Sequence, residues 1–119
     1  MKITMICTEF PPNYRGGLGV YIERVTQQLQ KEKHDITLYS LNYPYALPKV
    51  EQRDHLKLHR ISPCTFTRRG LDKTRGKLSL SAILYNALNL GMFNWHTFRK
   101  IWRQHKQEGV GTLAVHDWM

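Results

Sequence analysis

The stretch that decides the fold is KITMICT at residues 2–8, followed by EFPPNYRGG at residues 9–17. The first part is a short apolar run, which is typical of a buried strand. The second part holds two prolines and two glycines, which exclude regular structure and indicate a loop. From that point apolar residues recur at helical spacing, at Leu18, Tyr21, Ile22, Val25 and Leu29. This pattern predicts an amphipathic helix that ends near Lys33.

A second apolar run, ITLYSL at residues 36–41, follows this helix and predicts another strand. Strand, loop, helix and strand in this order form a βαβ unit, in which the strands are parallel and the crossover is right-handed. Leu56, Leu58 and Ile61 predict a third strand, and residues 112–115 predict a last one. We therefore predict an α/β fold, a Rossmann-like three-layer domain with a parallel sheet of about four strands.

The segments between these strands are two polar loops and a long helix. Residues 42–53 contain Pro44 and Pro48 and predict a loop, and residues 62–77 predict a basic surface loop. Residues 78–107 predict a helix, in which a break would fall near Gly91. Its apolar residues form one stripe: Leu80, Leu84, Ala87, Gly91, Trp95, Phe98 and Trp102. We expect this stripe, tryptophans included, to face the core.

Composition limits the function classes. The chain has 119 residues, with 18 Lys and Arg against 9 Asp and Glu, and a formal charge of +9. This length fits one domain, and no segment approaches the roughly 20 apolar residues of a membrane span. The N-terminus has no secretory cleavage pattern, and Cys7 and Cys64 fit no disulfide framework or metal spacing. We therefore expect a cytoplasmic protein with an anionic partner: nucleic acid, anionic lipid or a phosphorylated substrate.

The first candidate site is the loop Arg15-Gly16-Gly17-Leu18, which opens the first helix. Glycines let backbone N–H groups approach a ligand, and a helix N-terminus carries a partial positive charge, so phosphate is the expected ligand. We also expect both glycines to adopt conformations that a side chain would strain. The alternative is a tight turn that only seats the helix on the sheet.

The second candidate site is His116-Asp117-Trp118, directly after the last strand. Ligands of open α/β sheets bind at the carboxyl ends of the strands. His116 and Asp117 could therefore contact a sugar hydroxyl or a reacting centre, with Trp118 as a wall. The alternative is a polar turn at a strand end.

The third candidate is a basic helix surface. Arg99, Arg103 and Lys106 follow one another at helical spacing near Trp95 and Trp102. Such a helix is typical of a membrane interface, and the alternative is a solvated face. The rival function is therefore a non-catalytic, basic membrane- or lipid-binding module, peripheral at the inner face of the membrane. Nucleic acid is a weaker candidate partner, because no zinc spacing, helix-turn-helix or aromatic RNA-binding run is present. The remaining histidines show no ligand spacing.

A dinucleotide-binding oxidoreductase is the weaker alternative enzyme. Its Gly-x-Gly-x-x-Gly fingerprint is not met by Gly16-Gly17-Leu18-Gly19. The second predicted strand also ends at Leu41-Asn42 without the carboxylate that would hold a ribose.

The motifs EFPP (9–12), GGLGV (16–20), HDITL (34–38) and HDWM (116–119) occur together and in this order. The combination resembles the start of glycogen-synthase-like retaining glycosyltransferases, which have the GT-B fold of two Rossmann-like domains. The resemblance implies transfer of a hexose from a nucleotide sugar to a glycan or lipid-linked acceptor, with no cofactor and no metal. By position it places Arg15, Gly16, Gly17 and Leu18 at the donor phosphates, and His116 and Asp117 at the sugar as catalytic residues.

The chain departs from this family at several positions. Lys33 stands where the family often has a glycine, and Gly111 and Ala114 stand where an Asp and a second His are frequent. Tyr14 replaces a lysine of the glycogen synthases. The resemblance therefore favours a general hexosyltransferase.

The resemblance also implies a domain organisation. Residues 1–119 would form an incomplete N-terminal, acceptor-side domain, and a separately encoded C-terminal donor domain would be a partner. We expect such a chain to transfer no sugar alone and to be marginally stable. Leu113, Val115 and part of the stripe from Leu80 to Trp102 would stay partly exposed to water.

Overall fold

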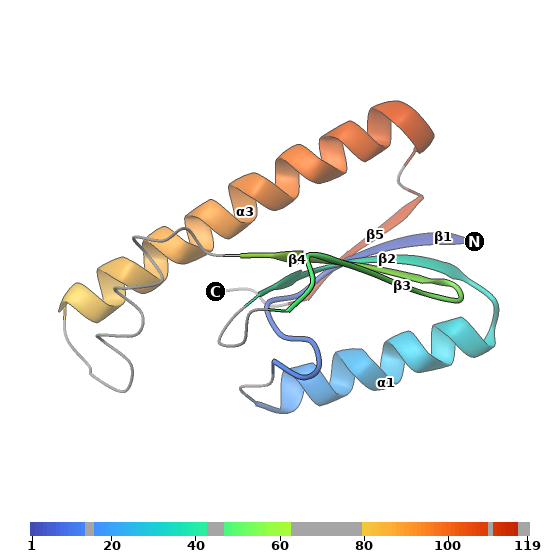
Figure 1. The fold of residues 1–119 in the computed structure, drawn as a ribbon, viewed down its shortest axis with the longest axis horizontal. Coiled ribbons are helices and arrows are strands. Elements are labelled where there is room, and N and C mark those ends of the chain that lie inside the picture. The colour runs from blue at the N-terminus through green and yellow to red at the C-terminus, as the bar shows by residue number, and fades with distance from the viewer. Residues whose placement is uncertain (14–15, 43–46, 63–79, 110, 117–119) are drawn as a thin grey trace.

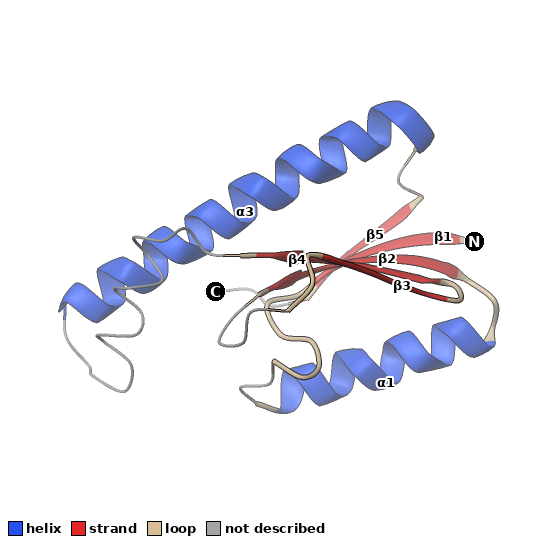
Figure 2. Cartoon of the chain, in the orientation of Figure 1, coloured by secondary structure: helices blue, strands red, loops and turns tan. Residues whose placement is uncertain are grey.

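The structure, a computed structural model, describes residues 1–13, 16–42, 47–62, 80–109 and 111–116. It is an α/β domain with one mostly parallel sheet in the order β3-β4-β2-β1-β5, between helix α1 on one face and helix α3 on the other (Figure 1, Figure 2). The elements are β1 Lys2–Ile6, α1 Gly17–Lys31, β2 Asp35–Leu41, β3 Val50–Arg53, β4 Leu56–Ile61, α3 Leu80–Glu108 and β5 Thr112–Val115. The α/β prediction is thus confirmed, in a form compatible with a Rossmann-like domain.

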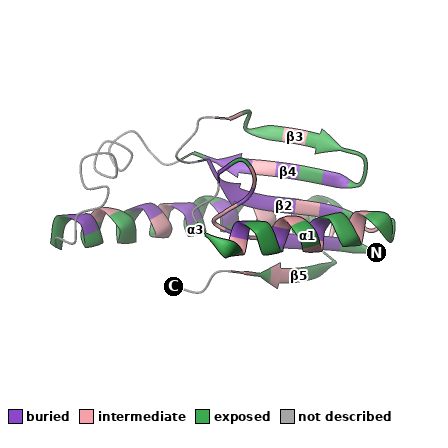
Figure 3. Ribbon diagram, turned by 90° about the horizontal axis from the view of Figure 1, so that it is seen from below, coloured by how far each residue is buried: buried purple, intermediate pink, exposed green. Residues whose placement is uncertain are grey.

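The β3 strand corrects the prediction of a loop over residues 42–53 and of about four strands. It brings the number of strands in the sheet to five, and it pairs antiparallel with β4. The connecting turn is Asp54-His55, and Asp54 has a φ of 33°, as tight hairpins require. No β3 side chain is buried (Figure 3), because β3 is a charged edge strand. Such a strand lacks the apolar alternation that sequence patterns detect.

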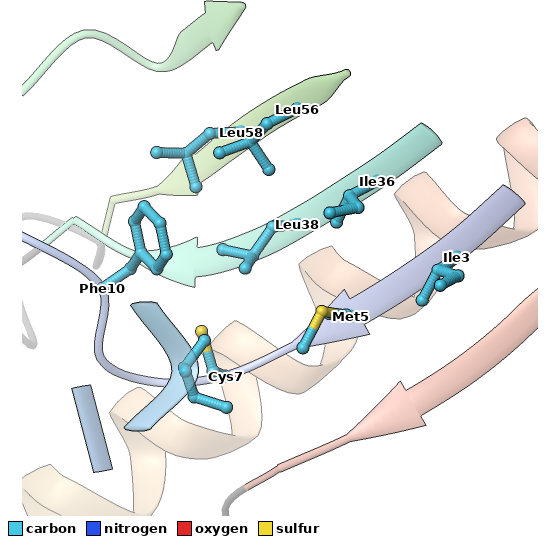
Figure 4. Close-up of a cluster of buried hydrophobic side chains, with 9 residues drawn as sticks. Ile3, Met5, Cys7, Phe10, Ile36, Leu38, Leu56 and Leu58 are labelled. Atoms are coloured by element: carbon cyan, nitrogen blue, oxygen red, sulfur yellow. The ribbon is translucent and has the colours of Figure 1, made fainter. Parts of the chain in front are cut away.

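The larger half of the core lies between the sheet and α1. Alternate residues of β1, β2 and β4 point to this face and are joined by Ile22 of α1. Figure 4 shows them side by side: Ile3, Met5, Cys7, Phe10, Ile36, Leu38, Leu56 and Leu58. This packing confirms the buried strands predicted from the apolar runs.

The smaller half of the core lies between the sheet and α3, and it is partly polar. Tyr39 stacks on His59 with ring centroids 5.0 Å apart, and the Tyr39 hydroxyl donates to Gln104 Oε1 at 2.9 Å. Burial lowers the pKa of His59 to about 4, helped by the positive charge of Lys100. Burial also raises the pKa of Tyr39 to about 12.

The orientation of α3 corrects the expectation that its tryptophans face the core. Trp95 and Trp102 are 59% and 51% exposed, and the buried residues of the helix lie on a different side: Ala82, Asn89, Phe93 and Thr97. This orientation lets Gln104 reach both Tyr39 and Thr37 on the sheet. The helix also runs through Gly91 without a break. The residues of the stripe are exposed, and so are Leu113 and Val115.

Helix α1 ends in a Schellman motif. The backbone N–H of His34 donates to the Leu29 carbonyl, and that of Lys33 donates to the Gln30 carbonyl. Lys33 therefore occupies the left-handed position, with a φ of 60°. Glycine is the usual residue at this position because it has no Cβ to clash.

Gly111 seats β5 against β1. Its φ is +64°, and a Cβ at this position would collide with the backbone carbonyl oxygen of Lys2. The next residue, Thr112, pairs with Ile3 in the parallel ladder. Only a glycine lets the two backbones approach this closely.

Candidate functional site

The candidate site lies at the carboxyl ends of β1 and β5. From β1 the chain passes through α1 to β2, which lies on one side of β1. Strand β5 lies on the other side of β1 and follows α3 (Figure 1). This arrangement is a topological switch point, where open α/β sheets bind ligands. His116 is held there because its backbone N–H donates to the Ile6 carbonyl at 2.9 Å.

Tyr21 brings the N-terminal part of α1 to His116. The two rings meet edge to face with centroids 6.0 Å apart. The sequence pattern assigned Tyr21 to the core-facing stripe of the helix, but its side chain is 53% exposed. This exposure leaves its phenol available to the site.

A small cavity opens beside His116. Its volume is about 50 Å³, and its polar lining comes from Thr8, Asn94 and His116, with room for water-sized groups. The sequence patterns did not indicate Thr8, Tyr21 or Asn94 as site residues. The position of Thr8 was detectable, since it is a polar residue just after a buried strand at the ligand-binding edge.

The N-terminus of α1 already has an anionic partner. Gly16 is the N-cap and has no side-chain cap of its own, but its backbone N–H donates to Glu9 Oε2 at 3.1 Å. The helix dipole favours a negative group at this position. The carboxylate of Glu9 therefore takes a place that a phosphate could occupy, a role that sequence analysis did not assign.

The two loop glycines correct the expectation of backbone strain. Gly16 has a φ of −170°, which is extended backbone open to any residue. A Cβ on Gly16 or Gly17 would meet no atom within 4 Å. The Leu18 side chain packs against the core, so only the backbone amide of Leu18 is left to bind a ligand.

Three predicted site residues lie outside the described residues: Arg15, Asp117 and Trp118.

Arg60 of β4 holds the loop after β1 in place. Its side chain is 3% exposed, and its guanidinium donates to Glu51 Oε2 at 2.7 Å. It also donates to the carbonyl oxygens of Pro48 and Pro11, each at 3.4 Å. The Arg60 hydrogen bond lowers the pKa of Glu51. The loop is thus tied to the sheet and to the β3–β4 hairpin.

A larger cavity lies at the opposite edge of the sheet. It has a volume of about 210 Å³ and is lined by residues at the amino ends of the strands, among them Asp35 and His55. These two side chains pair at 2.8 Å, and the hydrogen bond from His55 lowers the pKa of Asp35. Both are well exposed to solvent. Parallel sheets bind ligands at the other edge, so we place the candidate site beside His116.

The end of β2 does not match a ribose site. Asn42 is buried, and its side-chain Oδ1 accepts from the Leu47 backbone N–H at 2.9 Å. Its Nδ2 donates to the Leu47 carbonyl at 2.7 Å. Asn42 thus closes a loop.

In the described part of the chain, no three His, Cys, Asp or Glu side chains are placed to hold a metal ion, and no helix could span a membrane.

No protein-family model matches the chain. An uncharacterized glycosyltransferase of Methanocaldococcus jannaschii is 29% identical over 63 residues. These residues are 53% of this chain but 16% of that protein, so the chain matches a small part of a longer relative. The chain is thus similar to part of a protein named a glycosyltransferase, and its α/β fold is compatible with that class.

Proposed function

We propose that this chain is the acceptor-side domain of a retaining GT-B glycosyltransferase, which moves a hexose from a nucleotide sugar to a glycan or lipid-linked acceptor. The observation that carries the proposal is the contact between Tyr21 and His116. It joins the N-terminal end of α1 and the carboxyl end of β5 in one site. The glycosyltransferase name of the archaeal relative agrees with it.

The proposed chemistry assigns a role to each part of the site. The backbone amides from Gly16 to Leu18 would face the donor diphosphate, with Arg15 beside them. Negative charge grows on the diphosphate as it leaves the sugar, and a helix N-terminus stabilises such charge. His116 would hydrogen-bond a donor-sugar hydroxyl, with Asp117 next to it. A second domain would supply the remaining donor contacts.

Glu9 makes the proposal testable. Its carboxylate accepts from the Gly16 N–H, so a diphosphate at α1 must compete with it. Removing this charge in Glu9→Gln should tighten nucleoside diphosphate binding roughly two- to fivefold, the effect of one charge at a helix N-terminus. Glu32→Gln at the other end of α1 is the matched control, because it makes the same charge change. We expect no tightening there.

The measurement is an NMR titration of the ¹⁵N-labelled chain with ADP, GDP and UDP. It reports on the contacts of this domain directly and detects weak binding. We expect amide shifts at Gly16 and Gly17 and a shift of the His116 ring. Shifts confined to the Asp35–His55 edge, or none with any of the three nucleotides, would contradict the proposal.

A further inference from the structure

The side of α3 that faces away from the sheet is apolar over most of its length. Leu84 precedes Phe93 by nine residues and Trp102 follows it by nine, which is two and a half helical turns each way. Because Phe93 packs in the core, Leu84 and Trp102 lie on the opposite side. The same side carries three further large side chains, each more than half exposed: Leu80, Trp95 and Phe98. We call this surface the outward face.

The aromatic residues of the outward face form a continuous row. Trp95 and Phe98 stack with ring centroids 6.3 Å apart, and Phe98 and Trp102 stack at 6.0 Å. Part of the α3 surface against the sheet is, by contrast, polar. The buried side-chain oxygens of Asn89 and Thr97 have no hydrogen-bond partner among the described residues. A helix whose only role is to cover a sheet has its apolar side against the sheet and its polar side toward solvent.

Positive charge flanks the outward face, and the one acid of α3 is its last residue, Glu108. Arg99, Arg103 and Lys106 are exposed, and Lys106 Nζ lies 5.6 Å from the centroid of the Trp102 ring. No Asp or Glu occurs from Leu80 to Gln107. Helices that lie in a membrane interface combine Trp, Phe and Leu with flanking Lys and Arg in this way. Trp rings and long basic side chains meet lipids at the headgroup level.

We propose that the outward face of α3 docks on a membrane surface that contains anionic lipids. Charge complementarity decides between the occupants of this face. A second copy of the chain would bring two sets of cationic side chains together, and each copy carries a formal charge of +9, so the copies would repel. An anionic lipid surface attracts the same charges while its acyl region receives the aromatic row. The N-terminal part of α3 projects beyond the sheet (Figure 1, Figure 3), and Leu80 and Leu84 are exposed there.

The test is sedimentation of the chain with phosphatidylcholine vesicles, with and without phosphatidylglycerol. We expect binding to the anionic vesicles, weakening as salt rises from about 0.1 to about 0.5 M. The double variant Arg99→Gln/Arg103→Gln should bind roughly 25-fold more weakly, at about fivefold for each charge. Its matched control is Arg24→Gln/Lys31→Gln, which removes two exposed charges from α1 on the other side of the sheet. The control should change binding less than about twofold.

The aromatic row is tested by Trp95→Ser/Trp102→Ser. Both side chains are more than half exposed, so this variant should keep the fold, as circular dichroism would verify. We expect its vesicle binding to fall at least about tenfold. Equal binding to neutral vesicles, or equal losses in the α1 and α3 charge variants, would overturn the proposal. So would self-association in sedimentation velocity that the tryptophan variant abolishes, without vesicle binding, because the occupant would then be a second copy.

Discussion

Gly111→Ala should destabilise the domain by more than the cost of holding an alanine in the left-handed conformation. A left-handed residue with a Cβ costs about 1–2 kcal/mol, and Gly111 has a φ of +64°. Its new Cβ would also collide with the Lys2 carbonyl oxygen, and relieving such overpacking costs about 1–3 kcal/mol. Subtracting the roughly 0.4–1 kcal/mol that Gly→Ala gains by restricting the unfolded chain leaves a loss of about 1–4 kcal/mol. Because His116 directly follows β5, a displacement of β5 should also move the NMR signal of the His116 ring.

Two other glycines separate these contributions. Gly109 has a φ of +73° with open space around it, so Gly109→Ala should lose about 1 kcal/mol, the left-handed cost less some unfolded-state entropy. Gly91 lies inside α3 with no atom near its Cβ position. Gly91→Ala should therefore gain about 0.8–1 kcal/mol of helix propensity. The three substitutions are chemically identical and differ only in their surroundings.

The assay is urea unfolding followed by circular dichroism, with the NMR signal of His116 as the local readout. The order expected for the free energy of unfolding is Gly91→Ala above wild type, then Gly109→Ala, then Gly111→Ala. The reasoning fails if Gly111→Ala loses no more than Gly109→Ala, because the β1–β5 backbone contact would then not exist.

Two further predictions concern stability. The pKa of His59 is lowered from 6.5 to about 4, so its contribution to stability is complete above pH 6.5 and is lost as the pH falls toward 4. His59→Phe keeps the ring stack on Tyr39 without titrating, so its urea midpoint should fall less between about pH 7 and about pH 5. Lys33→Gly should raise the free energy of unfolding by about 1 kcal/mol by relieving the left-handed strain. Lys33→Ala should leave it nearly unchanged, and an equal gain there would contradict this cause.

The elements that bury apolar side chains could be predicted from the sequence. The apolar runs at residues 2–8 and 36–41 place buried side chains on both faces of the sheet. These runs form β1 and β2. By contrast, β3 has no buried side chain and therefore no periodic pattern. The existence of α3 was predictable, but its orientation was not. A helix with apolar residues on opposite sides does not reveal which side the sheet takes.

The site was predictable only where position along a strand decides it. His116 follows a strand and Gly16 opens a helix, and the structure describes both at the expected edge. Tyr21 and Asn94 come from helices that cross the sheet, on opposite faces, and reach the site only through packing. The carboxylate of Glu9 was equally hidden, because its hydrogen bond to Gly16 depends on the path of the loop.

The buried guanidinium of Arg60 constrains how this sequence can change over evolution. It links the edge hairpin to the loop after β1 through Glu51 and Pro11. Loss of Glu51 alone would leave a buried cation without its carboxylate, which is worse than losing both charges. Positions 51 and 60 are therefore expected to mutate as a pair, and relatives that lack the hairpin carboxylate should have an uncharged residue in place of the arginine. An edge strand with no place in the chemistry would thus stay under selection through the loop it helps to hold.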